Sequence, residues 1–162
     1  FAMASRVAIM NGGLIQQIGS PRVVYRAPAN HFVAEFVGSN NILPGTVTGL
    51  EGGQVTVQTE WGSFSAPQPE PAPAKGDTLE LVVSADLVAV SDQAGEHDNV
   101  LSGELISEEF IGSIITLYID IGGGIVFRAQ KQQHELDALE YTSGRRLYAS
   151  WRPEHTYVLP QI

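Results

Sequence analysis

The sequence predicts a mainly β chain: a short β-hairpin and two short helices, followed by a duplicated domain of two small barrel-like halves. Three observations lead to this prediction. A glycine-rich turn separates two apolar segments near the start of the chain, two helix-start signals follow, and the remaining residues form short strand-like segments that recur in order. We expect the boundary between the two parts to lie between residues 40 and 41.

The hairpin is predicted over Arg6–Ile18, with Asn11-Gly12-Gly13 at its turn. Asn-Gly supplies the positive φ angles that a tight turn between twisted strands requires. The first helix is expected to start at Ser20-Pro21, because proline at the first helical position lacks only an N–H that would be unpaired there. This helix should end before Pro28, whose ring disfavours helical backbone in the preceding residue.

Asn30 is expected to cap a second helix, which Gly38 is placed to end. The apolar residues of this helix fall at helical spacing: Phe32, Val33, Phe36 and Val37. Phe32 and Phe36 are candidates for a stripe that binds a partner. We expect instead that they pack in the core of this short segment.

Residues 41–162 are predicted to form two half-repeats, 41–91 and 99–162. Asn41-Ile-Leu-Pro-Gly45 recurs as Asn99-Val-Leu-Ser-Gly103, and further along the chain Gly76 matches Gly144. A repeated five- or six-strand unit indicates two small barrels packed against each other. The expected strands are Gly45–Leu50, Gln54–Thr59, Trp61–Ala66, Thr78–Ser84, Leu87–Val90, Leu101–Ser107, Ile114–Ile121, Ile125–Ala129, Arg145–Trp151 and Thr156–Leu159.

Composition and charge exclude several classes of protein. The formal net charge is −9, and a nucleic-acid surface needs clustered Lys and Arg, so we exclude nucleic acid as a partner. The chain contains no cysteine, which excludes a disulfide scaffold and is compatible with a reducing compartment. No apolar run approaches the roughly 18 residues of a membrane span, and nothing at Phe1 resembles a signal peptide. We therefore expect no direct membrane insertion.

The negative charge is concentrated in one stretch. Residues 76–127 contain ten carboxylates and no Lys or Arg. We interpret this stretch as a solvated acidic face, and a surface that attracts a cationic ligand or partner is the alternative.

The first part of the chain carries a recognisable signature. It consists of Arg6-Val-Ala-Ile-Met-Asn-Gly-Gly-Leu-Ile-Gln-Gln-Ile-Gly-Ser-Pro21, then Tyr25-Arg-Ala-Pro28, then Phe32-Val-Ala-Glu-Phe-Val-Gly38. This signature resembles the end of the ATPase domain in ABC-importer ATP-binding subunits, specifically the group that handles polyamines, iron(III), sulfate and maltose-type sugars. Phe1–Ala4 resembles the end of the helix after that family's switch histidine.

The second part resembles the regulatory domain of the same family, an OB-fold-like domain called TOBE. Glu109-Phe-Ile-Gly-Ser113 and Trp151-Arg-Pro-Glu154 are similar to recurring patterns of that domain. The sequence departs from the family in its first half, where Ser84-Ala85-Asp86 stands at a position that often has Arg-Pro-Glu. A ligand contact normally made by that arginine is not expected here.

The resemblance implies that the chain is the regulatory, dimerisation part of a subunit that powers solute import. In the intact subunit two copies would dimerise, and ATP binding would close them against membrane permease subunits. The regulatory domain would hold the two ATPase halves at high effective concentration. The implied location is cytoplasmic, on the inner face of the cell membrane, and the implied substrate is a polyamine, iron, a sugar or a related solute.

The catalytic machinery is not expected in this chain. The sequence contains no phosphate-binding Gly-x-x-x-x-Gly-Lys-Ser/Thr loop, so ATP and magnesium would bind in the remainder of the ATPase domain. We therefore predict no catalytic, cofactor-binding or metal-ligating residues and no ATP hydrolysis by the chain alone. The alternative is a stand-alone protein that binds small oxyanions between the halves of a duplicated OB-like fold, and the ATPase-like first part argues against it.

The candidate site for a ligand or an interface is Trp151, Arg152 and Glu154. An aromatic face beside a guanidinium at the end of a strand can hold an anion or the backbone of a partner. A core tryptophan next to an Arg–Glu surface pair is the simpler interpretation, and we favour it.

Two other groups carry less weight. Asp92, Glu96, His97 and Asp98 could ligate a hard cation, but they lie in a polar connection without a fixed spacing motif. Three histidines lack a neighbouring nucleophile and orienting acid, so no catalytic triad is predicted: His31, His134 and His155.

Overall fold

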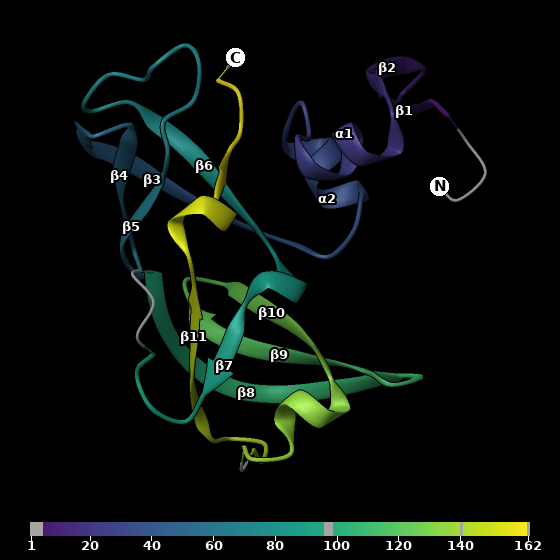
Figure 1. Ribbon diagram of the computed structural model, residues 1–162, viewed down its shortest axis with the longest axis vertical. Coiled ribbons are helices and arrows are strands. Elements are labelled where there is room, and N and C mark those ends of the chain that lie inside the picture. Colours follow the sequence, from purple (N-terminus) through teal and green to yellow (C-terminus); the bar gives the residue numbers. More distant parts are fainter. Residues whose placement is uncertain (1–4, 96–98, 140, 162) are drawn as a thin grey trace.

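The chain folds into a small amino-terminal unit and a larger body of two β-sheets (Figure 1). The computed structural model describes residues 5–95, 99–139 and 141–161. We call residues 5–38 the amino-terminal unit and residues 39–161 the body. The prediction of a mainly β chain with two short helices is confirmed.

The amino-terminal unit is built from the local signals in its sequence. Its elements are β1 (Val7–Asn11), β2 (Leu14–Gly19), α1 (Pro21–Arg26) and α2 (His31–Phe36). The hairpin turn is made by Gly12 and Gly13, with φ angles of 58° and 81°. Ser20 and Asn30 cap the two helices, because their side chains accept hydrogen bonds from the backbone N–H groups of Val23 and Val33.

A small apolar cluster holds the unit together, and it corrects one expectation. Val24, Val33 and Val37 pack around Ile9 of the hairpin. Phe36 does not join them: its ring stacks on Phe32 at a centroid distance of 5.9 Å and is 62% exposed. The prediction that Phe36 packs in the core is therefore wrong. Helical spacing groups residues on one face, but α2 buries only the side toward β1 and the side toward the body.

The body contains the remaining strands and three short 3₁₀ helices. The strands are β3 (Asn40–Glu51), β4 (Gln54–Thr59), β5 (Gly62–Pro67), β6 (Thr78–Ser84), β7 (Ala89–Ser91), β8 (Asn99–Ile111), β9 (Ile114–Gly122), β10 (Ile125–Gln132), β11 (Arg146–Trp151) and β12 (Tyr157–Val158). The 3₁₀ helices are η1 (Ala85–Leu87), η2 (Gln133–Leu136) and η3 (Pro153–His155).

Each half of the body contributes its last strand to the other half's sheet. The first sheet has the order β12-β6-β3-β4-β5, and the second has the order β10-β9-β8-β11-β7. Strand β7 therefore lies beside β11, while β12 lies beside β6, and all these pairs are antiparallel. The two halves are interlocked as well as packed against each other (Figure 1).

The first strands of the two halves, β3 and β8, share the same irregularities. Each has a β-bulge, at Thr48 in β3 and at Ile106 in β8. Each also has a glycine where a neighbouring strand approaches closely. A Cβ on Gly45 would lie 2.7 Å from the backbone oxygen of Gln58, and a Cβ on Gly103 would collide with the backbone oxygen of Asp120. Glycine is therefore required at both positions.

One apolar core lies between the two sheets, and Trp151 is at its centre. Its indole is 1% exposed and packs against Phe64 of β5 and Phe127 of β10, with ring centroids 5.0 and 5.5 Å away. The indole Nε1 donates a hydrogen bond to Thr156 Oγ1 at 3.0 Å. Aromatic side chains from both halves thus meet around one residue.

Two buried asparagines clasp the halves together in equivalent ways. Asn41 accepts a hydrogen bond from the Arg128 backbone N–H and donates one to the Arg128 backbone oxygen, both at 2.8 Å. Asn99 does the same with Ser65, at 2.9 Å for both bonds. Each amide side chain therefore hydrogen-bonds to the backbone of an edge strand in the opposite half, β10 for Asn41 and β5 for Asn99.

The clasp gives the first prediction. Asn99→Ala leaves the N–H and C=O groups of Ser65 without partners inside the protein, and should lower the free energy of unfolding by about 2–4 kcal/mol. Urea denaturation followed by tryptophan fluorescence measures this change. Gln54→Ala, which removes an exposed amide from β4, is the control and should change stability by less than about 0.5 kcal/mol. Equal effects of the two substitutions would contradict the role of the clasp.

Candidate functional site

The structure divides the predicted site at the end of β11 between the core and the surface. Trp151 points into the core, whereas the side chains of Arg152 and Glu154 are 63% and 62% exposed. Arg152 Nη1 lies 3.8 Å from Glu154 Oε1, which is a surface ion pair of small energetic weight. The three side chains do not form one surface on which a ligand could contact the indole.

A groove runs past this turn and its counterpart in the first half. The turn Arg152–His155 corresponds to Ser84–Leu87, because each follows the strand that pairs with its half's first strand and each forms a 3₁₀ helix. The groove has a volume of about 590 Å³ and is bounded on its other side by the amino-terminal unit. Its charged lining residues are Arg26, Asp86 and Glu154. Arg26 of the amino-terminal unit lies opposite the carboxylates of Asp86 and Glu154. Because two negative charges line the groove beside one positive charge, a simple anion is not expected to bind there.

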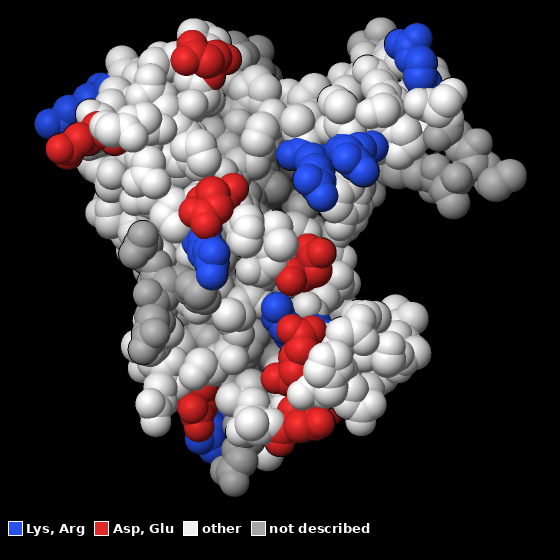
Figure 2. Space-filling model, viewed as in Figure 1, with Lys and Arg blue, Asp and Glu red and all other residues white. Residues whose placement is uncertain are grey.

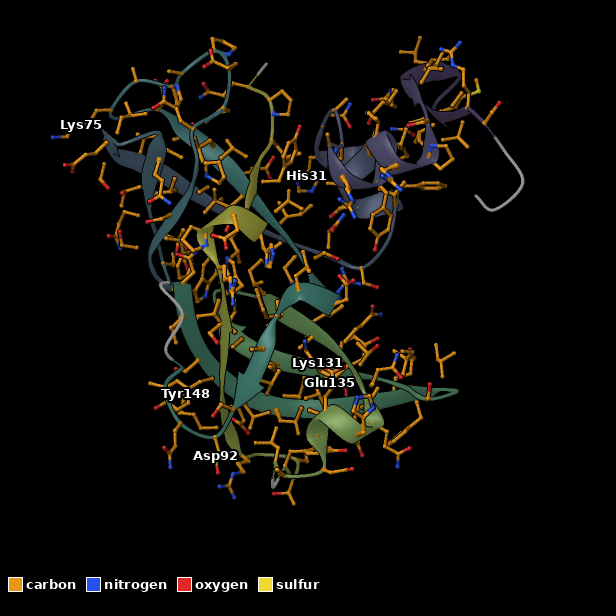
Figure 3. The ribbon with its side chains drawn as sticks, viewed as in Figure 1. His31, Lys75, Asp92, Lys131, Glu135 and Tyr148 are labelled. Carbon is orange, nitrogen blue, oxygen red and sulfur yellow. The ribbon has the colours of Figure 1, made fainter. Side chains whose placement is uncertain are left out.

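Lys131 connects the two halves close to this groove, and sequence reasoning missed it. Its Nζ donates a hydrogen bond to the Asp86 backbone oxygen at 3.3 Å and lies 4.0 Å from Glu135 Oε2 (Figure 3). Burial lowers the pKa of Lys131 below its ordinary value of 10.5, although the charges of Glu135 and Asp86 act in the opposite direction. The sequence did not single out this lysine, because the Asp86 oxygen that it contacts belongs to the other half of the body.

His31 joins the amino-terminal unit to the body. Its Nδ1 lies 2.6 Å from Glu80 Oε2 on β6, and its Nε2 lies 3.1 Å from Glu35 Oε1 on α2 (Figure 3). Partial burial lowers the pKa of His31, but the hydrogen bonds and charges of Glu80 and Glu35 together raise it more. The net result is a pKa above the ordinary value of 6.5.

A second groove, of about 760 Å³, lies beside this histidine. It is lined by residues of β3, β4 and β6 and by the carboxy-terminal residues Leu159–Gln161. Its ionisable lining residues are His31, Glu60 and Glu80. Since Glu80 is already held by His31, the lining offers little that would fix a ligand.

The remaining candidates are not assembled into a site. Asp92 Oδ2 lies 3.4 Å from Arg145 Nη2, and Glu96, His97 and Asp98 lie outside the described residues, as does Phe1–Ala4. No side-chain hydrogen bond joins His134 or His155 to another described residue. In residues 5–95, 99–139 and 141–161, no group of His, Asp and Glu is arranged to hold a metal ion. Within the same ranges, neither helix is long and apolar enough to cross a membrane.

Comparison with known families identifies a domain in the second half of the chain. Residues 85–159 match the family described as TOBE domain. This range begins at η1 and includes β7, which belongs structurally to the second sheet. It also includes β12, which belongs to the first sheet, so the matched range contains one strand of the first sheet as well as most of the second.

Curated relatives match nearly the whole chain. Proteins named "Spermidine/putrescine import ATP-binding protein PotA" are 33% identical in Frankia alni, over 98% of this chain and 36% of the relative, and 35% identical in Rubrobacter xylanophilus, over 97% of this chain and 41% of the relative. The relative of the same name in Thermobifida fusca is 32% identical over 98% of this chain. The chain spans about two fifths of the length of these relatives.

Among solved structures, the chain resembles the cytoplasmic molybdate-binding protein ModG. The TM-score is 0.67 at 18% sequence identity, and the match covers 76% of this chain and 99% of ModG. At this identity the likeness concerns the fold. It agrees with the duplicated OB-like fold predicted from the repeats.

The position of Trp151 gives the second prediction. Trp151→Ala should lower the free energy of unfolding by roughly 3–5 kcal/mol, because it empties the centre of a core shared by both sheets. Chemical denaturation followed by circular dichroism measures this change. Trp151→Phe retains most of the apolar volume and should cost clearly less. An unchanged denaturation midpoint for Trp151→Ala would contradict the core role and favour a binding role.

The third prediction concerns pH. Since the pKa of folded His31 is raised, its contribution to stability should be full below the ordinary value of 6.5 and should disappear as the pH rises through the folded-state value. Both partners are partly exposed to solvent, so the contribution should stay below about 1 kcal/mol. Urea denaturation of the wild type and of His31→Gln, at about pH 5.5 and pH 8.5, measures it.

The stability difference between the wild type and His31→Gln should be larger at the lower pH. His134→Gln is the matched control, because His134 is exposed and lacks such partners. A difference that is the same at both pH values for His31→Gln would contradict the assigned interaction.

Proposed function

Because this chain is homologous over nearly its whole length to the carboxy-terminal part of PotA-type ABC-importer ATP-binding subunits, we propose that it is the regulatory and dimerisation region of such a subunit. In this proposal residues 1–40 are the end of the ATPase domain, and residues 41–162 are the TOBE-type regulatory domain. The regulatory domain consists of the half-repeats 41–91 and 99–162, with their last strands exchanged.

The exposed apolar side chains on the two faces of the hairpin are the observation on which this proposal rests. Leu14 is 70% exposed, and three further large apolar side chains of β1 and β2 are about half exposed: Met10, Ile15 and Ile18. A two-stranded hairpin is at best marginally stable in water unless another layer covers it. The rest of an ATPase domain, whose end the hairpin resembles in sequence, would provide that layer.

The body then acts by holding two subunits together. A regulatory region that dimerises keeps two ATPase domains at high effective concentration, so that ATP can close them reversibly. The partners of the intact subunit would be a second copy and the membrane permease subunits, and its place would be the cytoplasmic face of the cell membrane. The names of the relatives favour spermidine and putrescine as transported solutes.

A chimaera tests this proposal and gives the fourth prediction. The ATPase domain of the Rubrobacter xylanophilus relative, up to its hairpin, is joined to residues 5–162 of this chain. We expect the chimaera to bind and hydrolyse ATP, whereas the chain alone should show no binding in isothermal titration. Leu14→Asp with Ile15→Asp should abolish hydrolysis or solubility of the chimaera, because it places charges in the interface between the hairpin and the ATPase domain.

Leu87→Asp is the control for this substitution. Leu87 is a 43% exposed apolar residue of the body, so a charge there should leave ATP hydrolysis unchanged. A chimaera that folds but tolerates both hairpin charges without loss of hydrolysis would overturn the proposal. Micromolar ATP affinity of the chain alone would overturn it as well.

The fold likeness to ModG favours a second candidate function, the binding of small oxyanions. The charge of the body argues against it. Residues 39–162 contain six Lys and Arg against 17 Asp and Glu, a difference of −11. Titration of the chain with molybdate distinguishes the two candidates, since micromolar affinity would favour the oxyanion-binding alternative.

A further inference from the structure

The amino-terminal unit and the body are joined by one short segment. Figure 2 shows the unit as a projection at the upper right, and Figure 1 shows the connection that runs from α2 to β3. We call residues 38–40 the hinge, because they follow the C-cap of α2 at Val37 and lead into β3. The direction in which the unit leaves the body therefore depends on how firmly the hinge is held.

Two contacts outside the hinge attach the unit to the body, and both are small. His31 pairs with Glu80, but their side chains are 47% and 36% exposed, so solvent screens this pair. Ala34 packs on Val82 and Leu159, and it contributes a single methyl group to that cluster. On another side, the groove of about 590 Å³ separates the two parts. These contacts do not amount to a broad packed interface.

A glycine and an asparagine fix the shape of the hinge itself. Gly38 has a φ angle of 64°, and a Cβ at this position would lie 2.6 Å from the ring of Tyr25. The side-chain Nδ2 of Asn40 donates hydrogen bonds to the backbone oxygens of Ala34 and Val37, at 2.9 and 3.1 Å. Asn40 is buried, so these bonds are shielded from water. They tie the end of α2 to the start of β3.

Strand β10 of the second sheet holds the hinge from outside. Arg128 Nη2 donates a hydrogen bond to the Asn40 backbone oxygen at 2.9 Å, and Gln130 Nε2 donates one to Ser39 Oγ at 3.0 Å. The backbone N–H of Ala85 in η1 donates to the Ser39 backbone oxygen at 2.8 Å. Because Arg128 and Gln130 are two residues apart on β10, alternation along the strand places both on the side away from the core. We call these two side chains the clamp.

The duplication of the body provides an internal comparison for the clamp. The equivalent asparagine clasps place Ser65 of β5 and Arg128 of β10 at equivalent positions. Ser65 has a short side chain, and Pro67, which corresponds to Gln130, has no side-chain donor. The clasp is thus common to both halves, whereas the long donors occur on the strand that reaches the hinge. This difference indicates a role that the duplicated fold alone does not require.

We propose that Arg128 and Gln130 are positioning residues that clamp the hinge and fix the direction in which the amino-terminal unit leaves the body. The second half of the body, which is not adjacent to the unit in sequence, thereby sets the orientation of the unit. The consequence for ATP hydrolysis rests on the proposed function, in which the unit is the end of the ATPase domain. In that setting the second sheet orients the ATPase domain. The clamp itself does not depend on that setting.

Distances between two spin labels test the clamp and give the fifth prediction. The chain has no cysteine, so Arg22→Cys in α1 and Gln54→Cys in β4 provide two exposed label sites, one in each part. Pulsed electron spin resonance at about pH 8.5, where the contribution of His31 should be absent, measures the distance distribution. With the clamp intact, the distribution should have one narrow peak. Arg128→Met with Gln130→Ala should widen it by about twofold or more, because the hinge loses both side-chain donors of β10.

The controls separate orientation from stability. Labels at Gln54→Cys and Glu104→Cys lie within the body, and their distribution should not change when the clamp is removed. Arg146→Met is the matched control, because it removes an arginine of the same sheet whose side chain bonds to Ser102 instead of the hinge. It should leave both distributions unchanged. Arg128→Lys keeps a charged donor and should widen the distribution less than Arg128→Met.

Three results would overturn the clamp. They are a distribution that the double substitution leaves unchanged, an equal widening by Arg146→Met, and an equal widening for the two labels within the body. None of them bears on the chimaera, which tests the hairpin. A chimaera that hydrolyses ATP while the spin-label test fails would remove the clamp and leave the proposed function in place. The opposite pair of results would remove the proposed function and leave the clamp.

Discussion

The exchange of last strands between the two sheets is the constraint on which the rest of the body depends. Strand β7 completes the second sheet and β12 completes the first, so neither half can form its five-stranded sheet alone. The connections that carry these strands across bring the two 3₁₀ turns, η1 and η3, to the same side of the body. They also bring the inner faces of both sheets together, and Trp151 fills the space where these faces meet.

The two halves share one plan but have diverged at the places where they meet. Asn41 and Asn99 perform the same clasp, and both first strands have a bulge and a required glycine at matching positions. Trp151, by contrast, corresponds to Val83, so one half supplies the large residue that both halves surround. The two equivalent turns beside the groove differ likewise, since one begins with Ser84 and the other begins with Arg152. Because the two turns and the two core positions differ, the halves do not provide a pair of equivalent binding sites. They form one domain around a single shared core.

Local signals in the sequence predicted the individual helices and strands. They did not predict the pairing of strands that lie far apart in the sequence. The hairpin turn, the caps at Ser20 and Asn30 and the strands were predictable because their residues act on their own backbone. The repeat predicted two halves, but a repeat does not say whether its last strand stays or crosses, since both arrangements bury the same residues. The site was predicted less well for the same reason. The indole of Trp151 and the guanidinium of Arg152 are neighbours in sequence, yet Trp151 ends β11 inside the core and Arg152 begins the exposed turn to η3.

The exchanged strands also determine when the protein can fold during its synthesis. The first sheet needs Tyr157 and Val158 of β12, which the ribosome adds more than 70 residues after β6 is complete. Until then β6 has an open edge, and the apolar interior of the first half lacks the Trp151 ring. The body therefore cannot mature half by half, as two separate barrels would. Its folding must wait for almost the entire domain to emerge, and during that interval the strand edges that β7 and β12 will cover stay open.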